Sequence, residues 1–223
     1  TDVNEAPSVA LSGTTTSLAE DADTTSRTKV ADIDVTDDAL GTETLSLSGT
    51  DAALFEIFDG DLYLLAGASL DFEANGTLDV TVSVDDAAIP GSPDDSASLQ
   101  IAVTDVNEAP VLTVTSPGVS VAENGTAVAA GISAADADAG DTLTYSVEGT
   151  DAALFDIVST TGVLSFKAAP NFEAPSDNGG DNVYDITVKV TDSAGASDSK
   201  AVAVTVTDVN EAPSVALSGT TTS

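Results

Sequence analysis

Carboxylate side chains are the residues of this sequence that could do chemistry, and they recur at matching places along the chain. The 223 residues include 38 Asp and Glu against 5 Lys and Arg, a formal net charge of -33 at pH 7. Several of these acids stand in repeated strings, such as the DVNEAP string that begins at Asp105. Clustered carboxylates bind hard cations, and Ca²⁺ accepts their oxygens in a looser geometry than Mg²⁺ does. The recurring acids therefore predict a cation-binding protein.

The composition excludes several other kinds of site. Without Cys or His, the chain has no disulfide, no zinc or iron–sulfur site of the usual kinds, and no Ser–His–Asp or Cys–His catalytic group. Phosphate recognition needs clustered cations, and only Arg27 and Lys29 lie close together. No apolar run approaches the length of about 18 residues that suggests a membrane span. We therefore expect no binding of nucleic acid and no direct insertion into a membrane. The composition leaves open a glycosidase-like pair of carboxylates, but the absence of Trp and the repetition of the chain lead us to expect no enzyme.

Internal repeats predict the domain organisation. The DVNEAP string begins at Asp2, Asp105 and Asp208, so that both intervals are 103 residues, and residues 207–223 repeat residues 1–17 letter for letter. A perfect match at twice the period indicates a long array whose unit is a pair of domains, and we expect the chain to be a segment of a longer protein. The expected parts are a linker from the preceding repeat (1–7), a first domain (8–104), a linker (105–110), a second domain (111–207), and a linker with the start of the next repeat (208–223).

Short strands must position the acids. Alternating or β-branched stretches occupy residues 29–36, 44–48, 62–65, 78–84 and 97–103 in the first period, and residues 128–134, 143–147, 163–166, 183–190 and 201–206 in the second. In the stretch 78–84, apolar residues at every second position predict a half-buried strand. About six or seven short strands in roughly 100 residues predict an all-β chain of two tandem immunoglobulin-like Greek-key β-sandwiches.

Two local patterns refine this prediction. Asp59-Gly60 stands between two apolar runs and is a strong signal for a β-hairpin turn. Phe55, Phe155 and Tyr145 are expected in the cores of the sandwiches, because they stand within or beside the predicted strands.

The acidic motifs resemble the calcium-binding motifs of cadherin repeats. That family has an early Glu, an L-D-R-E box, a D-x-N-D-N-x-P linker and a D-x-D box. Here the corresponding residues are Glu20 or Glu123, the LDFE string ending at Glu73, the DVNEAP linker, and Asp136-Ala-Asp138. The order and spacing agree over both periods. In particular, the sequence resembles the cadherin-like tandem repeats of large bacterial surface adhesins of the RTX type, which implies sandwiches of cadherin type arranged end to end.

The resemblance implies two sets of calcium ligands. At the central junction these are Glu20, Asp71, Glu73, Asp105, Asn107, Glu108, Asp136, Asp138 and Asp192. Weaker sites are implied at Asp2, Asn4, Asp37, Asp38, Asp85, Glu123, Glu173, Asp208 and Asn210. In the first domain Thr36-Asp37-Asp38 stands where D-x-D is expected, so its upper site is expected to be degenerate. Asn171 replaces the Asp of the box in the second domain, so the following junction is expected to bind Ca²⁺ less tightly.

The function implied is that of an extender. The repeats would be made rigid by calcium and would hold a distal adhesive domain away from a bacterial cell, so the expected location is extracellular or on the cell surface. The partners would be calcium and neighbouring repeats of the same chain, and the molecule is expected to be monomeric. The alternative is a calcium-dependent module that binds carbohydrate or another copy of itself. For a polysaccharide, only Tyr63, Tyr145 and Tyr184 could stack on sugar rings.

Overall fold

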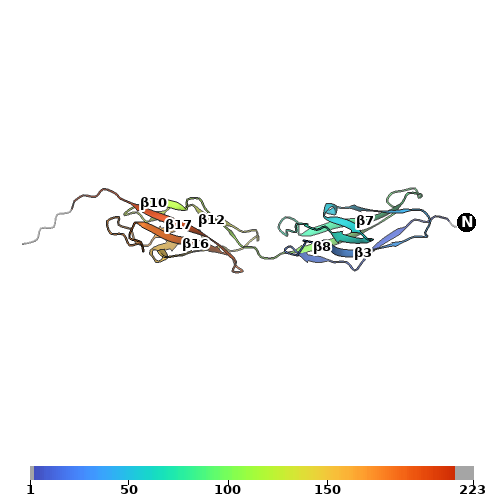
Figure 1. The fold of residues 1–223 in the computed structure, drawn as a ribbon, viewed down its shortest axis with the longest axis horizontal. Helices are drawn as coiled ribbons and strands as arrows, with labels where there is room; N and C mark the ends of the chain where they lie inside the picture. The colour runs from blue at the N-terminus through green and yellow to red at the C-terminus, as the bar shows by residue number, and fades with distance from the viewer. Residues whose placement is uncertain (1–2, 214–223) are drawn as a thin grey trace, which may run out of the picture. The chain divides into compact units, whose positions relative to one another are not determined.

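The computed structural model describes residues 3–213. The chain divides into two compact units, with the boundary in the sequence between Val106 and Asn107, within the stretch predicted as a linker. Over the described residues, both units consist of β-strands with one short 3-10 helix each (Figure 1). Within residues 3–213, no helix has the length and apolar character needed to cross a lipid bilayer. The all-β class predicted from the sequence is confirmed.

Unit 1 is a sandwich of two four-stranded sheets. One sheet has the order β1-β3-β6-β5 and the other β2-β8-β7-β4. Strand β2 pairs parallel with β8, whereas β7 pairs antiparallel with both β4 and β8. Strands β1 to β5 alternate between the two sheets, whereas β5–β6 and β7–β8 each pair within one sheet, as in a Greek-key sandwich of the immunoglobulin type. The elements are β1 (Ser8–Ser12), β2 (Ser17–Ala19), β3 (Thr28–Thr36), β4 (Glu43–Ser48), η1 (Ala52–Leu54), β5 (Phe55–Phe58), β6 (Asp61–Leu64), β7 (Thr77–Asp86) and β8 (Asp95–Thr104).

Unit 2 repeats this plan with one sheet divided. The sheet β10-β17-β16-β13 is continuous, whereas the opposite layer consists of β11-β15-β14 and the pair β12-β9. The predicted strand 128–134 is interrupted because Gly131 has φ +63 and the carbonyls of Ala130 and Gly131 accept hydrogen bonds from Ser116 and Thr115. The elements are β9 (Val111–Val114), β10 (Gly118–Ala122), β11 (Ala127–Val128), β12 (Ile132–Ala135), β13 (Thr144–Glu148), η2 (Ala152–Leu154), β14 (Phe155–Ile157), β15 (Leu164–Phe166), β16 (Val183–Thr191) and β17 (Ser197–Thr207).

Each unit has its own hydrophobic core, built from the alternating residues of its longest strands. Every second residue of β7 from Leu78 to Val84 is at most 2% exposed. Burying a side chain of this size stabilises a fold by about 1.5–3 kcal/mol. Phe55, Phe155 and Tyr145 are 5%, 1% and 8% exposed, so the prediction that they belong to the cores is confirmed.

The hairpin predicted at Asp59-Gly60 is confirmed. The two residues have φ values of 52 and 86 and connect β5 to β6, with Phe58 paired to Asp61. Positive φ at both central positions is the geometry of the type I′ turn, whose twist matches that of the flanking strands.

The repeated string GTDAALF has a structural role in both units. Asp51 and Asp151, just before the 3-10 helices, each accept the backbone N–H of a residue on the neighbouring long strand, Asp79 or Asp185, at 2.8 Å. The glycine of the string, Gly149 in unit 2, has φ +107, and a Cβ there would lie 3.2 Å from the backbone of β16. The string therefore connects the 3-10 helix to the sheet, and we interpret its aspartate as structural and not as a ligand of a metal ion.

A carboxylate at the start of the last strand of each unit holds the first strand. Asp95 accepts the N–H of Val9 at 2.8 Å, and Asp198 accepts that of Leu112 at 2.9 Å. The N–H of Leu112 lowers the pKa of Asp198 below its ordinary value, although desolvation opposes this change. The folded unit therefore stabilises the ionised form of the Asp198 carboxylate.

We expect this hydrogen bond to make the unfolding of unit 2 depend on pH. Because the pKa of Asp198 is lower in the folded state, its stabilising contribution is complete above the unfolded pKa of about 3.9 and disappears as the pH falls through the folded pKa. In EDTA, the urea midpoint should fall between about pH 5 and pH 3, and Asp198→Asn should reduce this fall. The exposed Asp156→Asn is the control, and equal pH dependence in both variants would contradict the assignment.

Candidate metal centres

Three acids gather at the C-terminal end of unit 1. Glu20, Glu73 and Asp105 form this C-terminal cluster, in which one carboxylate oxygen from each residue lies within 4.8 Å of the others. Strand β2 pairs parallel with β8, so the residues that follow the two strands, Glu20 and Asp105, emerge side by side. The Oε2 atom of Glu20 accepts the N–H of Phe72 at 2.8 Å, and its Oε1 accepts that of Val106 at 2.7 Å. One carboxylate thus holds both the loop before β7 and the start of the linker.

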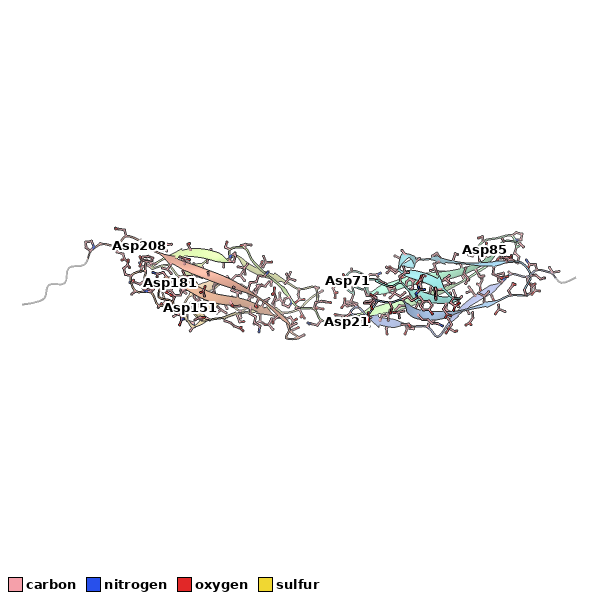
Figure 2. All side chains as sticks on the ribbon, viewed as in Figure 1. Asp21, Asp71, Asp85, Asp151, Asp181 and Asp208 are labelled. Atoms are coloured by element: carbon pink, nitrogen blue, oxygen red, sulfur yellow. The ribbon has the colours of Figure 1, made fainter. Side chains whose placement is uncertain are left out.

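Asp71 has a local role at the same end of unit 1 (Figure 2). Its Oδ1 accepts the N–H of Ala74 at 2.8 Å, which stabilises the turn that presents Glu73. Among residues 3–213, Asp71 belongs to none of the groups of three acids whose carboxylate oxygens lie within 4.8 Å of one another. In unit 2 the corresponding Asn171 accepts the N–H of Ala174 at 2.9 Å. Asparagine therefore keeps the hydrogen bond of the turn and removes one negative charge.

Unit 2 ends in an equivalent C-terminal cluster of Glu123, Glu173 and Asp208. Glu123 is only 3% exposed and accepts the N–H groups of Phe172 and Val209 at 2.9 Å each. These two hydrogen bonds lower the pKa of Glu123.

The neighbouring Glu173 has the opposite shift. Its own backbone N–H lowers its pKa, but desolvation and the charges of Glu123, Glu211 and Asp208 together raise the pKa above its ordinary value. The ionised form of Glu173 is therefore disfavoured at this end of unit 2, and a bound cation would stabilise it.

The N-terminal end of unit 2 holds another group of three acids. Asp136 follows β12, Asp141 lies in the loop to β13, and Asp192 follows β16, with one oxygen of each within 4.8 Å of the others. We call these residues the N-terminal cluster. The Nδ2 atom of Asn107 donates to Asp192 Oδ2 at 3.0 Å and, ahead of other causes, lowers the pKa of Asp192. Asp138 accepts the N–H of Glu108 at 2.9 Å.

Unit 1 shows the same two linker contacts with different residues. Asn4 donates to Asp86 Oδ2 at 2.7 Å, and the N–H of Glu5 is bound by Asp38 at 3.0 Å. The structural counterpart of Asp192 is thus Asp86, which is 1% exposed, so the correspondence of Asp85 with Asp192 was wrong, whereas Asp85 as a calcium ligand stays a prediction. The buried face of β7 carries the even-numbered residues up to Asp86, whereas Asp85 lies on the opposite face.

The remaining predicted ligands lie as follows. Asp37 stands beside Asp38 after β3, so the two acids of unit 1 are adjacent where unit 2 has an alanine between them. Asn210 is exposed beyond β17. Asp2 lies outside the described residues. Sequence reasoning missed Asp86 and Asp141. The alternation of β7 could have identified the first, and the short Ala139-Gly140 turn before Asp141 was the available signal for the second.

The donor atoms of these clusters fit a hard cation. In the N-terminal cluster, Asp136 Oδ2 and Asp141 Oδ2 are buried oxygens that have no hydrogen-bond partner, as are Asp37 Oδ1 and Asp85 Oδ1 of unit 1. Two carboxylates about 5 Å apart repel by about 3 kcal/mol at an effective dielectric constant near 20. Ca²⁺ takes about six to eight oxygens in a flexible shell, whereas Mg²⁺ requires a small octahedron. Oxygens that lack a donor and lie close to other carboxylates are the arrangement that Ca²⁺ accommodates.

The tyrosines offer little surface for stacking on sugars. Tyr145 is 8% exposed and Tyr184 is fully buried, with its ring 5.0 Å from that of Phe166. Tyr63 is half-buried and makes an edge contact with Phe58, the two ring centroids being 6.0 Å apart.

Comparison with known proteins agrees with this geometry. A family model for the bacterial Ig domain matches residues 107–205. Among solved structures, extracellular cadherin domains 1-5 of protocadherin gamma B2 are 26% identical, with a TM-score of 0.67, covering 94% of this chain and 42% of that one. The protocadherin gamma B7 EC3-6 cis-dimer structure is 25% identical, with a TM-score of 0.64 and coverage of 92% and 51%. Human protocadherin-24 EC1-2 is 23% identical, with a TM-score of 0.60 and coverage of 93% and 100%.

These likenesses establish the kind of domain. Unit 2 matches a bacterial Ig domain, and the chain is structurally similar to cadherin repeats. The chain spans about half the length of the protocadherin gamma B7 fragment, or 51%. No curated protein sequence matches it. The similar structures contain adhesion-type domains and not enzymes.

Proposed function

We propose that this chain is a segment of calcium-rigidified extender repeats in a long bacterial surface adhesin. In this role, Ca²⁺ binds at each domain boundary, stiffens the linker, and lets the array hold a distal adhesive domain away from the cell. The observation that carries the proposal is the placement of the C-terminal clusters. In both units a Glu of the cluster, Glu20 or Glu123, accepts the N–H of the first linker valine, Val106 or Val209.

The two donor sets that flank the central linker are joined by a very short piece of chain. Asp105 belongs to the cluster of unit 1, and Asn107 is hydrogen-bonded to Asp192 within unit 2. Two residues span at most about 7 Å, so covalent connection keeps these donors near each other. We propose that the ions use both sets: Glu20, Asp71, Glu73, Asp105, Asn107, Glu108, Asp136, Asp138 and Asp192. Carboxylates and an amide oxygen supply the ligands, and the bound ions supply the positive charge that offsets the repulsion between the acids.

The repeats support the extended array. The DVNEAP string recurs at an interval of 103 residues and residues 207–223 copy residues 1–17, as expected of domains in series. We propose domains at 8–104 and 111–207, joined by the linker 105–110. The match of residues 107–205 to a bacterial Ig domain supports a bacterial source, and the printed description of the protocadherin gamma B2 domains as extracellular supports a location outside the cell.

Small-angle X-ray scattering of the chain tests this proposal. The maximum dimension should increase and the scattering should indicate a stiffer molecule when Ca²⁺ replaces EDTA, because the ions hold the linker in one conformation. Glu20→Gln keeps an oxygen for the N–H of Val106 but removes the charge, so it should reduce the response. Asp156→Asn alters an exposed acid far from the linker in sequence and should respond like the unaltered chain. A maximum dimension that is the same in Ca²⁺ and EDTA would refute the extender function.

A further inference from the structure

The loop before β16 is longer than its counterpart before β7, and it presents an Asn-Gly pair to solvent. Four residues lie between Phe72 and β7, whereas ten lie between Phe172 and β16, and we call these ten, residues 173–182, the β16 loop. Asn178 and Gly179 within it are exposed. An Asn side chain that precedes Gly is open to attack by the backbone, because glycine has no Cβ to hinder the approach of its nitrogen.

Hydrogen bonds hold the β16 loop around this pair. Asp177 is 7% exposed, and its two carboxylate oxygens accept the N–H groups of Asp181 and Asn182 at 3.1 Å each. The N–H of Asn178 donates to Oδ1 of Asp151, an acid labelled in Figure 2, at 2.8 Å. Both oxygens of Asp177 thus bind the backbone of the loop itself, and this gives the loop a defined path.

The tip of the loop leaves the reacting atoms without partners. The N–H of Gly180 donates to the carbonyl of Asp177 at 3.3 Å, so Asn178 and Gly179 are the two central residues of a turn. The hydrogen bond of such a turn joins its first and fourth residues and does not use the N–H of the third. In the described part of the chain, neither the Asn178 side chain nor the Gly179 N–H makes a hydrogen bond.

The other two Asn-Gly pairs of the sequence are restrained by hydrogen bonds. Asn75 is half-buried, its Nδ2 donates to Asp51 Oδ1 at 2.8 Å, and its Oδ1 accepts a backbone N–H at 3.3 Å. After Asn124, the N–H of Gly125, whose nitrogen would have to attack, donates to the carbonyl of Ala122 at 3.1 Å. These hydrogen bonds must open before the atoms can react, so both pairs should react about 10-fold more slowly than the pair in the β16 loop.

We propose that Asn178 is a site of spontaneous deamidation that belongs to unit 2 alone. The amide nitrogen of Gly179 attacks Cγ of Asn178, and a C–N bond forms as the bond from Cγ to the side-chain nitrogen breaks. The proton of the attacking N–H leaves with that nitrogen as ammonia. Water then opens the cyclic succinimide at either of its carbonyl groups, which gives aspartate or isoaspartate. Either product adds a negative charge to the loop, and isoaspartate also adds a methylene group to the backbone.

This inference goes beyond the proposed function, because the reaction needs neither a metal ion nor a neighbouring domain. The new carboxylate would stand between Asp177 and Asp181 in the sequence, in a chain that already has a net charge of -33. In an array with a two-domain repeat, every second domain would acquire this charge with time.

Peptide mapping by mass spectrometry of the whole 223-residue chain tests the assignment. The chain is incubated in neutral and in mildly alkaline buffer and digested at acidic pH, where the reaction is slow. Conversion at Asn178 should be about 10-fold faster than at Asn75 or Asn124. It should also be faster in the alkaline buffer, because the Gly179 nitrogen must lose its proton. Asn178→Gln keeps the amide but requires a larger ring, so residue 178 should then remain unconverted.

The unfolded chain provides the control for the role of the fold. In urea with EDTA the hydrogen bonds at Asn75 and Asn124 are lost, so the three asparagines should convert at similar rates. If Asn178 did not convert, or converted no faster than the other two in the folded chain, the proposal would be overturned. If Asn178 kept its lead in urea, the adjacent residues and not the fold would set the rate, which also overturns it. None of these measurements involves Ca²⁺, so their failure would leave the extender function standing.

Discussion

Adding Ca²⁺ to the metal-free chain is expected to raise its melting temperature by about 10–20 °C, when the ion is about 100-fold above its dissociation constant. An ion that binds only the folded state stabilises it by about 2.7 kcal/mol at that concentration, and in a domain of roughly 100 residues each kcal/mol shifts the midpoint by about 4–8 °C. The C-terminal and N-terminal clusters provide the charge that makes the metal-free state less stable. Differential scanning calorimetry in EDTA and in Ca²⁺ measures the shift.

The control must account for the high charge of the chain. With a net charge of -33, any salt reduces the general repulsion between acids, and cations screen it without binding at a site. Mg²⁺ at the same concentration, and NaCl at the same ionic strength, should therefore raise the midpoint by much less than Ca²⁺ does. If Mg²⁺ or NaCl gave the same shift as Ca²⁺, the calcium sites would be contradicted.

Phe155→Ala is expected to destabilise unit 2 by about 3–5 kcal/mol, a large part of the stability of a domain of this size. Phe155 is 1% exposed, its ring centroid lies 4.3 Å from that of Phe166, and it forms a T-shaped pair with Tyr184 at a centroid distance of 6.0 Å. Truncation leaves a cavity where three rings meet. Unfolding in urea, followed by the near-ultraviolet signal of the tyrosines, two of which lie in the core of unit 2, should move to a lower midpoint.

The two cores make this prediction specific to one unit. Because the buried residues form one cluster in each unit, Phe155→Ala should leave the unfolding of unit 1 unchanged and produce two separate transitions. Phe55→Ala, at the equivalent place in unit 1, is the matched variant and should affect the other transition. Phe58 is 50% exposed, so Phe58→Ala should lower the free energy of unfolding much less. If Phe155→Ala and Phe55→Ala each shifted one common unfolding transition, the conclusion that the two units have independent cores would be contradicted.

The strands and cores were largely predictable from the sequence. In β7 and β16 an apolar residue at every second position follows the alternation of side chains across a sheet, and these residues are buried as expected. Several strands of three to five residues were not predicted, among them β1, β2, β9 and β10. Strand β2 has 3 residues, too few for an alternation to be recognised, and its pairing partner β8 lies far away in sequence.

The candidate sites were only partly predictable. Glu20 and Glu123 were identified because they recur at the spacing of the repeats, and the structure places them in equivalent clusters. Asp85 was matched to Asp192 because two adjacent acids end the strand, and the buried face of β7 shows that Asp86 is the structural counterpart. Asp141 was missed because it lies outside the linker motifs, in a loop that is hydrogen-bonded to Ser193, 52 residues further along.

The sequence by itself determined that this is a repetitive, acidic, all-β chain with carboxylates concentrated at regular intervals. Those properties depend on composition, spacing and alternation, which can be read from neighbouring residues. Only the tertiary structure decided which carboxylates meet, because each meeting is made by segments far apart in the chain. The hydrogen bond from Asn107 to Asp192 spans 85 residues and that from Val106 to Glu20 spans 86. Local patterns carry no information on such contacts, whereas the packing of two sheets brings the strand ends, and the acids on them, together.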